Sequence, residues 1–329
     1  MEHNQLILSA KDVNIQFNLR GKVLHAIRGI DLDLYQGEVL AIVGESGSGK
    51  SVFTKSFMGL LDANGSITSG TIDYYGMADG KPLRLSDLRT EKDWLRVRGR
   101  EIAMVMQDPM TSLNPLKTIG AQIMEAVALH QGLKGAAAKE KTLEYLRDVG
   151  ITDPEKRFKQ YPHEFSGGMR QRVMIAMALA CKPDLLLADE PTTALDATIQ
   201  GQILSLITEQ SRKRGMAVLF ITHDLGVVAR IADNVGVMYA GHLVEHAPTA
   251  ELFRNPLHPY TRGLMRSAPG RAAMGMQRLP AITGSVPSLD NMPEGCPFAP
   301  RCDEALPRCF ESAPVARCEN GHSVACWAV

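Results

Sequence analysis

Gly44-Glu45-Ser46-Gly47-Ser48-Gly49-Lys50-Ser51 decides the fold of this 329-residue chain, because it matches the phosphate-loop pattern G-x-x-x-x-G-K-[ST] at every fixed position. The apolar run Val39 to Val43 before it is typical of a buried strand, and residues 52–61 after it are predicted to form a helix. Glycines let successive N–H groups turn inward around an anion, and a helix N-terminus adds positive charge. Lys50 is placed to reach the β- and γ-phosphates of a nucleotide, and Ser51 to hold Mg²⁺. The strand–loop–helix context disfavours the alternative of a glycine-rich turn before an ordinary helix.

Composition indicates a globular protein, and the length suggests two domains at about 150 residues each. Hydrophobic residues make up 45% of the chain, which is enough for a sizeable core. Lys+Arg and Asp+Glu both number 36, and the resulting net charge of zero argues against a nucleic-acid-binding protein with a broad basic face. No apolar run approaches the roughly 18 residues of a membrane-spanning helix. The N-terminal residues 1–5 lack the layout of a secretory signal, so we expect a cytosolic protein that could be peripheral to a membrane.

Alternating apolar side chains near the N-terminus predict strands with two distinct faces. Leu6 to Phe17 shows this alternation with a bend near Lys11-Asp12, and Ile27 to Leu34 shows it again. Gly70 to Tyr75 gives one more strand pattern. Phe17 ends its strand well before the phosphate loop, where its ring could stack on a purine base. A strand phenylalanine is as often a plain core residue, so both interpretations stay open on this pattern alone.

A mainly helical block is predicted between Gln107 and about Phe165. Glu101 to Met106 is typical of a buried strand, and it ends at Gln107 in a loop with two prolines. Gln107 could ligate Mg²⁺ or position a water molecule, or it could simply be the first residue of the loop. Beyond this loop, residues 118–131 and 137–149 show the apolar spacing of helices.

Two stretches in the second half of the chain carry groups suited to phosphate chemistry. Ser166-Gly167-Gly168 precedes a long helix predicted over Val173–Ala180 and could bind an anion, although Ser-Gly-Gly is also common in turns. The apolar strand Leu185 to Ala188 ends in two carboxylates. Asp189 fits a Mg²⁺ ligand, and Glu190 fits a base for an attacking water. The alternative is a strand that ends in two solvated acids.

A further strand, Ala217 to Ile221, is followed by His223. A histidine just past a strand can hydrogen-bond a γ-phosphate, but a single histidine there is more often a residue at a helix start. Strands that alternate with single helices imply right-handed crossovers and a parallel sheet, with binding sites at the carboxyl ends of the strands. The phosphate loop, Gln107, the acid pair and His223 all lie at such ends. The sequence therefore predicts an α/β fold with a nucleotide site along one edge of its sheet.

In order and identity, these motifs resemble the nucleotide-binding subunit of an ATP-binding cassette (ABC) transporter over roughly residues 6–268. The chain departs from the family's signature sequence at Phe165, usually Leu, and at Met169, often Gln. The resemblance implies an α/β phosphate-loop NTPase (RecA-like) core with an antiparallel β subdomain, within residues 1–268. It also implies an inserted α-helical subdomain at about 108–165 and a small Cys-rich C-terminal extension over 269–329.

The resemblance also implies roles for single residues. Contacts to ATP are implied for Phe17, Gly44, Glu45, Ser46, Gly47, Ser48, Gly49, Lys50, Ser51, Val52, Gln107, Asp189 and, at the signature and the loop after the acid pair, for Ser166, Gly167, Gly168 and Asp196. Magnesium ligation is implied for Ser51, Gln107 and Asp189, and catalytic roles for Glu190, His223 and Gln107. In this family two ATP molecules lie between two cassettes, each held by the phosphate loop of one chain and the signature of the other.

Two short motifs narrow the resemblance to the branch that imports dipeptides, oligopeptides and nickel. They are Gln107-Asp108-Pro109-Met110-Thr111-Ser112-Leu113-Asn114-Pro115 and His258-Pro259-Tyr260-Thr261, and the chain most resembles the D-type ATPase subunit of peptide permeases. The implied partners are a sister ATPase in a heterodimer, two transmembrane permease subunits and an extracytoplasmic substrate-binding protein, with no nucleic acid. The implied location is the cytoplasmic face of the cell (inner) membrane, as a peripheral subunit.

The tail carries five of the six cysteines with the spacing C-x5-C-x6-C-x8-C-x7-C. Such a cluster indicates metal rather than disulfides in a reducing compartment, but the spacing does not say which metal. The peptide-permease ATPases have a similar tail that binds a [4Fe–4S] cluster, which implies cluster ligation by Cys296, Cys302, Cys309 and Cys326, with Cys318 as an alternative ligand. Zinc, with His322 as a further ligand, and no metal at all stay open.

The expected function is ATP hydrolysis that energises uptake of di- or oligopeptides, with import of nickel or another small solute as the alternative within the family. A soluble cassette ATPase of DNA repair or translation is a remote alternative, because such proteins usually carry long coiled-coil insertions or two cassettes. A regulatory nucleotide-binding module without turnover is a further alternative, and the presence of Glu190 and His223 speaks against it.

Overall fold

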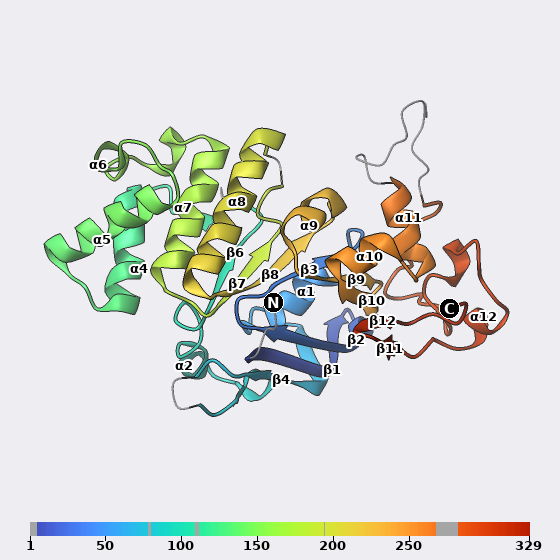
Figure 1. Cartoon of the computed structure of the whole chain (residues 1–329). Coiled ribbons are helices and arrows are strands. Elements are labelled where there is room, and N and C mark those ends of the chain that lie inside the picture. Colours follow the sequence, from blue (N-terminus) through green and yellow to red (C-terminus); the bar gives the residue numbers. More distant parts are fainter. Residues whose placement is uncertain (1–4, 78–79, 109–111, 194, 268–281) are drawn as a thin grey trace.

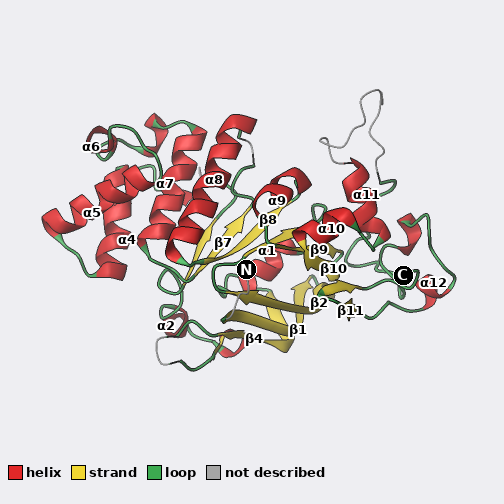
Figure 2. Ribbon diagram, viewed as in Figure 1, coloured by secondary structure: helices red, strands yellow, loops and turns green. Residues whose placement is uncertain are grey.

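The structure is a computed structural model that describes residues 5–77, 80–108, 112–193, 195–267 and 282–329. A mixed sheet runs through the middle of the molecule (Figure 1). The helical block lies at one end, the C-terminal extension lies at the opposite end, and the antiparallel sheet lies beneath (Figure 2). Pro109 to Thr111 of the loop after Gln107, and the predicted boundary at residues 268/269, lie outside the described residues.

The central sheet has eight strands. In spatial order they are β11 (Arg317–Glu319), β12 (His322–Val324), β10 (His242–Pro248), β9 (Asn234–Tyr239), β3 (Val39–Val43), β8 (Ala217–Thr222), β7 (Leu185–Asp189) and β6 (Ile102–Val105). The pairs from β9 through β3, β8 and β7 to β6 are parallel, which confirms the parallel sheet, and β10, β12 and β11 continue it with antiparallel pairs. Strand β12 pairs through Val324 with Glu245 of β10, so the C-terminal extension is part of this sheet.

A second sheet of four antiparallel strands packs against the first. Its spatial order is β2 (Lys22–Tyr35), β1 (Leu6–Leu19), β4 (Gly65–Tyr74) and β5 (Leu83–Arg84). The register of β1 and β2 shifts between Ala10 and Val13, and Asp12 has a φ of 47°. This irregularity is the bend predicted near Lys11-Asp12, because one residue in the left-handed region interrupts the pleat.

The helices flank the central sheet and form the block at one end (Figures 1 and 2). They are α1 (Lys50–Ser56), α2 (Glu91–Trp94), α4 (Ile119–Gln131), α5 (Gly135–Asp148), α6 (Pro154–Arg157), α7 (Gly167–Ala180), α8 (Ala197–Arg214), α9 (Leu225–Ile231), α10 (Thr249–Arg254), α11 (Pro259–Ser267) and α12 (Arg308–Glu311), with 3₁₀ turns at Leu85–Asp87, Pro162–Glu164 and Ala299–Arg301.

Two predicted helix bounds differ from the structure. The helix after the phosphate loop ends at Ser56 and not at residue 61, because Gly59 adopts a φ of +59° and lies so close to the Trp94 ring that a Cβ there would be 2.2 Å away. The signature helix starts at Gly167 and not at Val173, since the side chain of Ser166 accepts a hydrogen bond from the Met169 N–H and caps the first turn.

The parallel strands are buried on both faces. In β7, Leu185 and Leu187 belong to the core beneath the sheet, shared with β1, β2 and α1, whereas Leu186 and Ala188 belong to the core shared with α4, α5, α7 and α8. Continuous apolar strands of this kind are typical of a parallel sheet covered on both sides. The core therefore fixes the carboxyl ends of β3, β7 and β8 side by side, where the predicted site residues lie.

Candidate nucleotide-binding site

A cavity of about 730 Å³ opens over the phosphate loop at the carboxyl ends of the parallel strands. It brings together, from four separate stretches of sequence, most of the predicted site. Its lining residues are Ala26, Ser46, Gly47, Ser48, Gly49, Lys50, Ser51, Val52, Gln107, Glu190, Thr193, His223 and Leu289. The volume and the converging polar groups are typical of a small-molecule site.

Glycine is required at both ends of the phosphate loop. Gly44 has a φ of +157°, and a Cβ there would lie 2.2 Å from the backbone oxygen of Met238. Gly49 has a φ of +98°, and its Cβ would lie 2.8 Å from the Ile27 side chain. The loop therefore folds tightly against β9 and β2, and its glycines allow N–H groups to turn toward an anion.

Lys50 is buried at the floor of the cavity. Its Nζ donates to the carbonyl oxygens of Gly44 and Glu45, at 2.7 and 2.9 Å, and lies 3.4 Å from Ser48 Oγ. Burial lowers the pKa of Lys50, while the neighbouring carboxylates act in the opposite direction. A weakly solvated cation held this way is well placed to bind phosphate oxygens.

Ser51 and Asp189, two of the three predicted magnesium ligands, are hydrogen-bonded to each other, whereas the third, Gln107, donates to Glu190. Ser51 Oγ donates to Asp189 Oδ1 over 3.0 Å, although the two residues are 138 positions apart in the chain. Burial raises the pKa of Asp189, and the hydrogen bond from Ser51 opposes that shift. A hydroxyl and a carboxylate are hard oxygen ligands of the kind that Mg²⁺ prefers, so these residues fit the ion.

Glu190 is the centre of a polar cluster. Its Oε2 accepts hydrogen bonds from Gln107 Nε2 at 3.1 Å and from Thr193 Oγ1 at 2.9 Å, and its Oε1 lies 3.3 Å from His223 Nδ1. Glu190 also has a φ of 46°, a strained conformation for a side chain of this size. Strained backbone of this kind concentrates at functional sites, and here it holds the carboxylate between three polar partners.

Some predicted contacts lie away from this cavity. Phe17 is not among the described residues that line the cavity. Its ring packs on Gly65, so closely that a Cβ added at Gly65 would lie 2.5 Å from the ring. Ser166 and Gly167 are exposed at the start of α7, and Asp196 caps α8 by accepting from the Thr198 and Ile199 N–H groups. The single chain therefore presents the signature residues on a surface and not inside its own cavity.

Sequence reasoning missed several residues of the site. Thr193 and Ala26 line the cavity, as does Leu289 of the C-terminal extension. The hydroxyl of Tyr260 accepts a hydrogen bond from the Glu45 N–H at 2.9 Å. In the sequence, His258-Pro259-Tyr260-Thr261 is a family motif, and no local pattern predicts that it contacts the phosphate loop.

The cysteines of the tail differ in exposure. Cys309 and Cys326 are buried, whereas Cys318 on β11 is exposed, and the Cys296 N–H donates to the Cys309 carbonyl at 2.7 Å. Within the described ranges, which include all of these cysteines, no group of three or more His, Cys, Asp or Glu side chains is arranged to hold a metal ion. The structure therefore does not support the [4Fe–4S] site predicted at Cys296, Cys302, Cys309 and Cys326, or Cys318 as its alternative ligand.

The structure does not support the zinc alternative either, because within the described residues no group of three or more His, Cys, Asp or Glu side chains is arranged to hold a metal ion. His322, its further ligand, has Nε2 2.8 Å from Glu245 Oε1, and both side chains are buried.

Comparisons with known proteins agree with this geometry. The family description "ABC transporter" matches residues 27–193, just over half of the chain, and "Oligopeptide/dipeptide transporter, C-terminal region" matches residues 244–309. The chain belongs to the ABC transporter family. It is an ATPase of that family, in the oligopeptide/dipeptide branch, and the predicted family and fold class are confirmed.

Relatives of this ABC ATPase match it over nearly its whole length. It is 50% identical over 327 residues to the oligopeptide transport ATP-binding protein AmiE of Streptococcus pneumoniae, covering 99% of this chain and 90% of that protein. It is 48% identical over 324 residues to the dipeptide transport ATP-binding protein DppD of Bacillus subtilis, covering 98% and 94%. The dimeric ATP-binding cassette MJ0796, solved in a post-hydrolysis state bound to ADP and Pi, superimposes with a TM-score of 0.64 at 25% identity, covering 74% of this chain and 99% of that one.

In the described part of this ABC ATPase, no helix is both long and apolar enough to span a bilayer.

Proposed function

We propose that this protein hydrolyses ATP to drive the uptake of di- or oligopeptides through a membrane permease. The observation that carries the proposal is the cavity lined by Lys50, Ser51 and Glu190, with Asp189 hydrogen-bonded to Ser51, in a chain whose residues 244–309 match the oligopeptide/dipeptide region. The names of the relatives, oligopeptide and dipeptide transport ATP-binding proteins, support the same substrate class.

Binding of ATP in this proposal rests on the phosphate loop. The loop's N–H groups surround the phosphates, and the buried Lys50 binds the β- and γ-phosphates. Ser51 and Asp189 would hold Mg²⁺, which would supply charge neutralisation to the phosphates. Val52 at the first turn of α1 lines the same cavity beside Ser51.

Hydrolysis rests on the cluster around Glu190. Glu190 accepts a proton from the attacking water, while Gln107 and Thr193 hold its Oε2 in place and its Oε1 faces His223 Nδ1 at 3.3 Å. His223, 61% exposed at the mouth of the cavity, is placed to hydrogen-bond the γ-phosphate. Most of the rate enhancement then comes from positioning and electrostatic stabilisation, as is usual in phosphoryl transfer.

We propose that the functional unit is a heterodimer with a sister ATPase. The exposed position of Ser166 and Gly167 at the start of α7, away from this chain's own cavity, supports a composite site in which they complete the partner's ATP site. The 14-residue α7 presents its N-terminal N–H groups there, a suitable partner for phosphate oxygens. Asp196 follows Glu190 in the loop that would face the partner.

The proposed complex also contains two transmembrane permease subunits and an extracytoplasmic substrate-binding protein. Coupling would run from Gln107 at the cavity into the helices α4 and α5 beyond it, where exposed Leu116, just before α4, and Leu129 on α4 offer apolar contacts. The protein would then be peripheral at the cytoplasmic face of the cell membrane. Nickel, or another small solute, is the alternative cargo, because an ATPase of this kind does not touch the cargo.

Uptake in a strain that lacks this gene tests the proposal. Cells complemented with the wild-type chain are expected to accumulate a radiolabelled tripeptide, whereas cells that carry Glu190→Gln are not. Radioactive nickel supplied in parallel separates the two cargo classes. Nickel uptake without peptide uptake would overturn the peptide assignment, and co-purification with ribosomes or DNA in place of permease subunits would favour a soluble cassette ATPase.

A [4Fe–4S] cluster at the tail stays a proposal of the sequence pattern. It rests on the cysteine spacing and on the burial of Cys309 and Cys326, whereas Cys318 is exposed. Iron and sulfide analysis after anaerobic purification tests it, and iron-free protein under those conditions would reject it.

A further inference from the structure

The C-terminal extension contacts the phosphate loop through an ion pair between Arg301 and Glu45. Arg301, at the end of the Ala299–Arg301 turn, points both terminal nitrogens at Glu45, with Nη1 2.7 Å from Oε2 and Nη2 3.1 Å from Oε1. The side chain of Arg301 is only 5% exposed and that of Glu45 30%. Glu45 is the first variable position of the phosphate-loop pattern, and it lies 256 residues from its partner.

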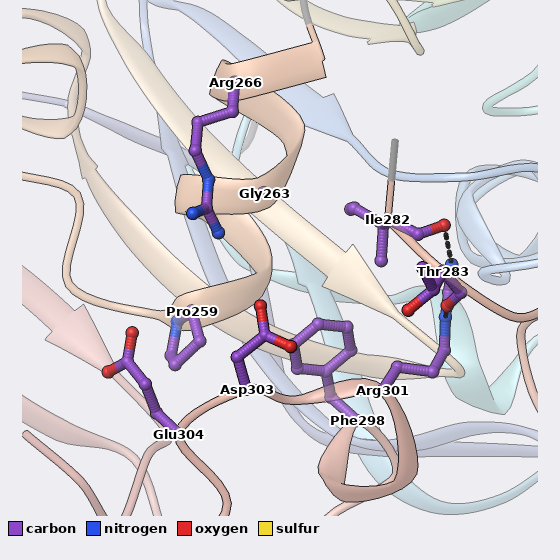
Figure 3. A pocket seen from close by; sticks show the side chains of 9 residues that line it. All are labelled: Pro259, Gly263, Arg266, Ile282, Thr283, Phe298, Arg301, Asp303 and Glu304. Atoms are coloured by element: carbon purple, nitrogen blue, oxygen red, sulfur yellow. Dashed lines mark hydrogen bonds between the residues drawn. The ribbon is translucent and has the colours of Figure 1, made fainter. Parts of the chain in front are cut away.

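Arg301 is itself held from several sides. Its Nε donates to the carbonyl of Thr283 at 2.8 Å, its Nη1 to the Tyr239 hydroxyl at 3.2 Å, and its Nη2 to the carbonyl of Gly284 at 3.3 Å. Figure 3 shows the guanidinium beside Ile282 and Thr283, with Phe298 next to it. A guanidinium with this many fixed partners loses little further conformational freedom when it binds a carboxylate. The two terminal nitrogens of Arg301 are therefore preorganised to bind Glu45.

The backbone of Glu45 is held from the same side. Tyr260 accepts the Glu45 N–H, and its ring packs against Tyr239 and Phe298 with centroids 4.7 and 5.3 Å apart. The carbonyl of Glu45 in turn accepts a hydrogen bond from Lys50 Nζ at 2.9 Å. A continuous chain of contacts therefore runs from Arg301 and Tyr260, through Glu45, to the lysine of the ATP site.

We propose that Arg301 is a positioning residue for ATP binding, which acts through Glu45 on the shape of the phosphate loop and on Lys50. The extension is then a working part of the nucleotide site and not an appendage to the cassette. Leu289 supports this independently, because it belongs to the extension and lines the ATP cavity. The proposal deepens the ATPase activity that the family establishes, and it does not depend on the cargo or on metal in the tail.

The competing explanation is that the pair only fastens the tail to the cassette. Both explanations predict some loss of stability when Arg301 is removed. Only a positioning role predicts weaker ATP binding by protein that is still folded. The loop's N–H groups bind phosphate in the ground state and in the transition state alike, so KM for ATP should rise while kcat changes little.

The test compares Arg301→Ala with a matched control in the full-length protein assembled with its partners. The control, Arg262→Ala, removes another arginine of the same region, whose Nη2 lies 2.6 Å from Glu304 Oε2 and whose side chain is 37% exposed. Steady-state phosphate release should show an about tenfold higher KM for Arg301→Ala, equivalent to about 1.4 kcal/mol, with kcat within about threefold. The control should change KM less than about twofold, because exposed pairs contribute little.

Three further variants keep the test decisive if Arg301→Ala fails to fold. Glu45→Gln preserves shape and should reproduce the rise in KM, and the double variant should be no worse than the single ones, because both remove the same interaction. Arg301→Lys keeps the charge without the fork and should recover only part of the affinity. Wild-type KM in folded Glu45→Gln or Arg301→Ala protein, or additive effects in the double variant, would overturn the proposal. If the wild-type complex itself released no phosphate from ATP, that result would instead count against the ATPase assignment.

Discussion

Replacement of Glu190 by glutamine separates ATP binding from hydrolysis in this site. Oε2 of Glu190 accepts from Gln107 and Thr193, and Oε1 faces His223 Nδ1 at 3.3 Å. A glutamine with its oxygen in the place of Oε2 keeps both acceptor contacts and turns its amide toward the imidazole, which can accept in one tautomer. The variant loses a charge and a proton acceptor, and no described hydrogen bond of this cluster has to break.

The expected fall in the hydrolysis rate follows from the loss of this proton acceptor. Removal of a positioned general base lowers the rate about 10²- to 10⁴-fold, equivalent to about 2.7–5.5 kcal/mol of barrier. ATP affinity should stay the same or increase, because Glu190 is the carboxylate with the largest electrostatic effect on Lys50 and it competes with phosphate for that cation. The unfolding temperature should move by no more than about 4 °C, since no buried contact is lost.

Three measurements on the assembled complex check these values. Phosphate release under saturating Mg-ATP gives kcat, a fluorescent ATP analogue gives affinity, and size-exclusion chromatography with ATP follows the closed nucleotide-bound dimer, which should accumulate. Thr193→Ser, which retains the hydroxyl that contacts Glu190, is the matched control and should hydrolyse ATP nearly as wild type does. Turnover of Glu190→Gln within about tenfold of wild type would remove Glu190 from the proposed base role.

Three further predictions concern other groups of the site. Lys50→Ala should weaken ATP binding about 100-fold, because it removes the buried cation of the loop; unchanged affinity by equilibrium dialysis would count against the phosphate-loop assignment. Asp189→Asn should lose Mg-dependent hydrolysis yet unfold at a higher temperature than wild type without nucleotide. Burial raises the pKa of Asp189, so its protonated form favours folding below the unfolded pKa of about 3.9 and that stability is lost as pH rises through the folded pKa. The difference in unfolding temperature between Asp189→Asn and wild type should therefore grow from pH 4 to pH 7. If a thermal-shift series gave a constant or shrinking difference, burial would not be the cause of the raised pKa. Ser166→Ala should leave ATP binding by the isolated chain unchanged but slow hydrolysis by the complex about tenfold or more, and equal loss in both would place Ser166 in this chain's own site.

The nucleotide core could be predicted from sequence because each part carries a local signal. The apolar runs of β3 and β7 and the phosphate loop itself depend on neighbours in the chain, and parallel connections then bring their carboxyl ends together. That logic placed Gln107, Glu190 and His223 around one cavity before any distance was known.

The features that the sequence did not predict all depend on contacts between residues that are far apart in the chain. The helix after the loop stops early because the Trp94 ring occupies the space beside Gly59, a contact with no trace in the local pattern. The C-terminal extension joins the central sheet through the three-residue strand β12, which is too short to show an alternation. The ion pair between Arg301 and Glu45 joins a residue next to a cysteine motif to a variable position of the loop pattern, and only folding reveals it.

ATP-driven transport by purified components tests the central assignment most directly. This chain, a sister ATPase, the two permease subunits and the binding protein would be reconstituted in proteoliposomes with a labelled oligopeptide on the side of the binding protein. We predict Mg-ATP-dependent phosphate release together with peptide accumulation, both lost when Glu190→Gln replaces the wild-type chain. Phosphate release that stays the same with and without peptide and binding protein, and no accumulation of peptide, would contradict it.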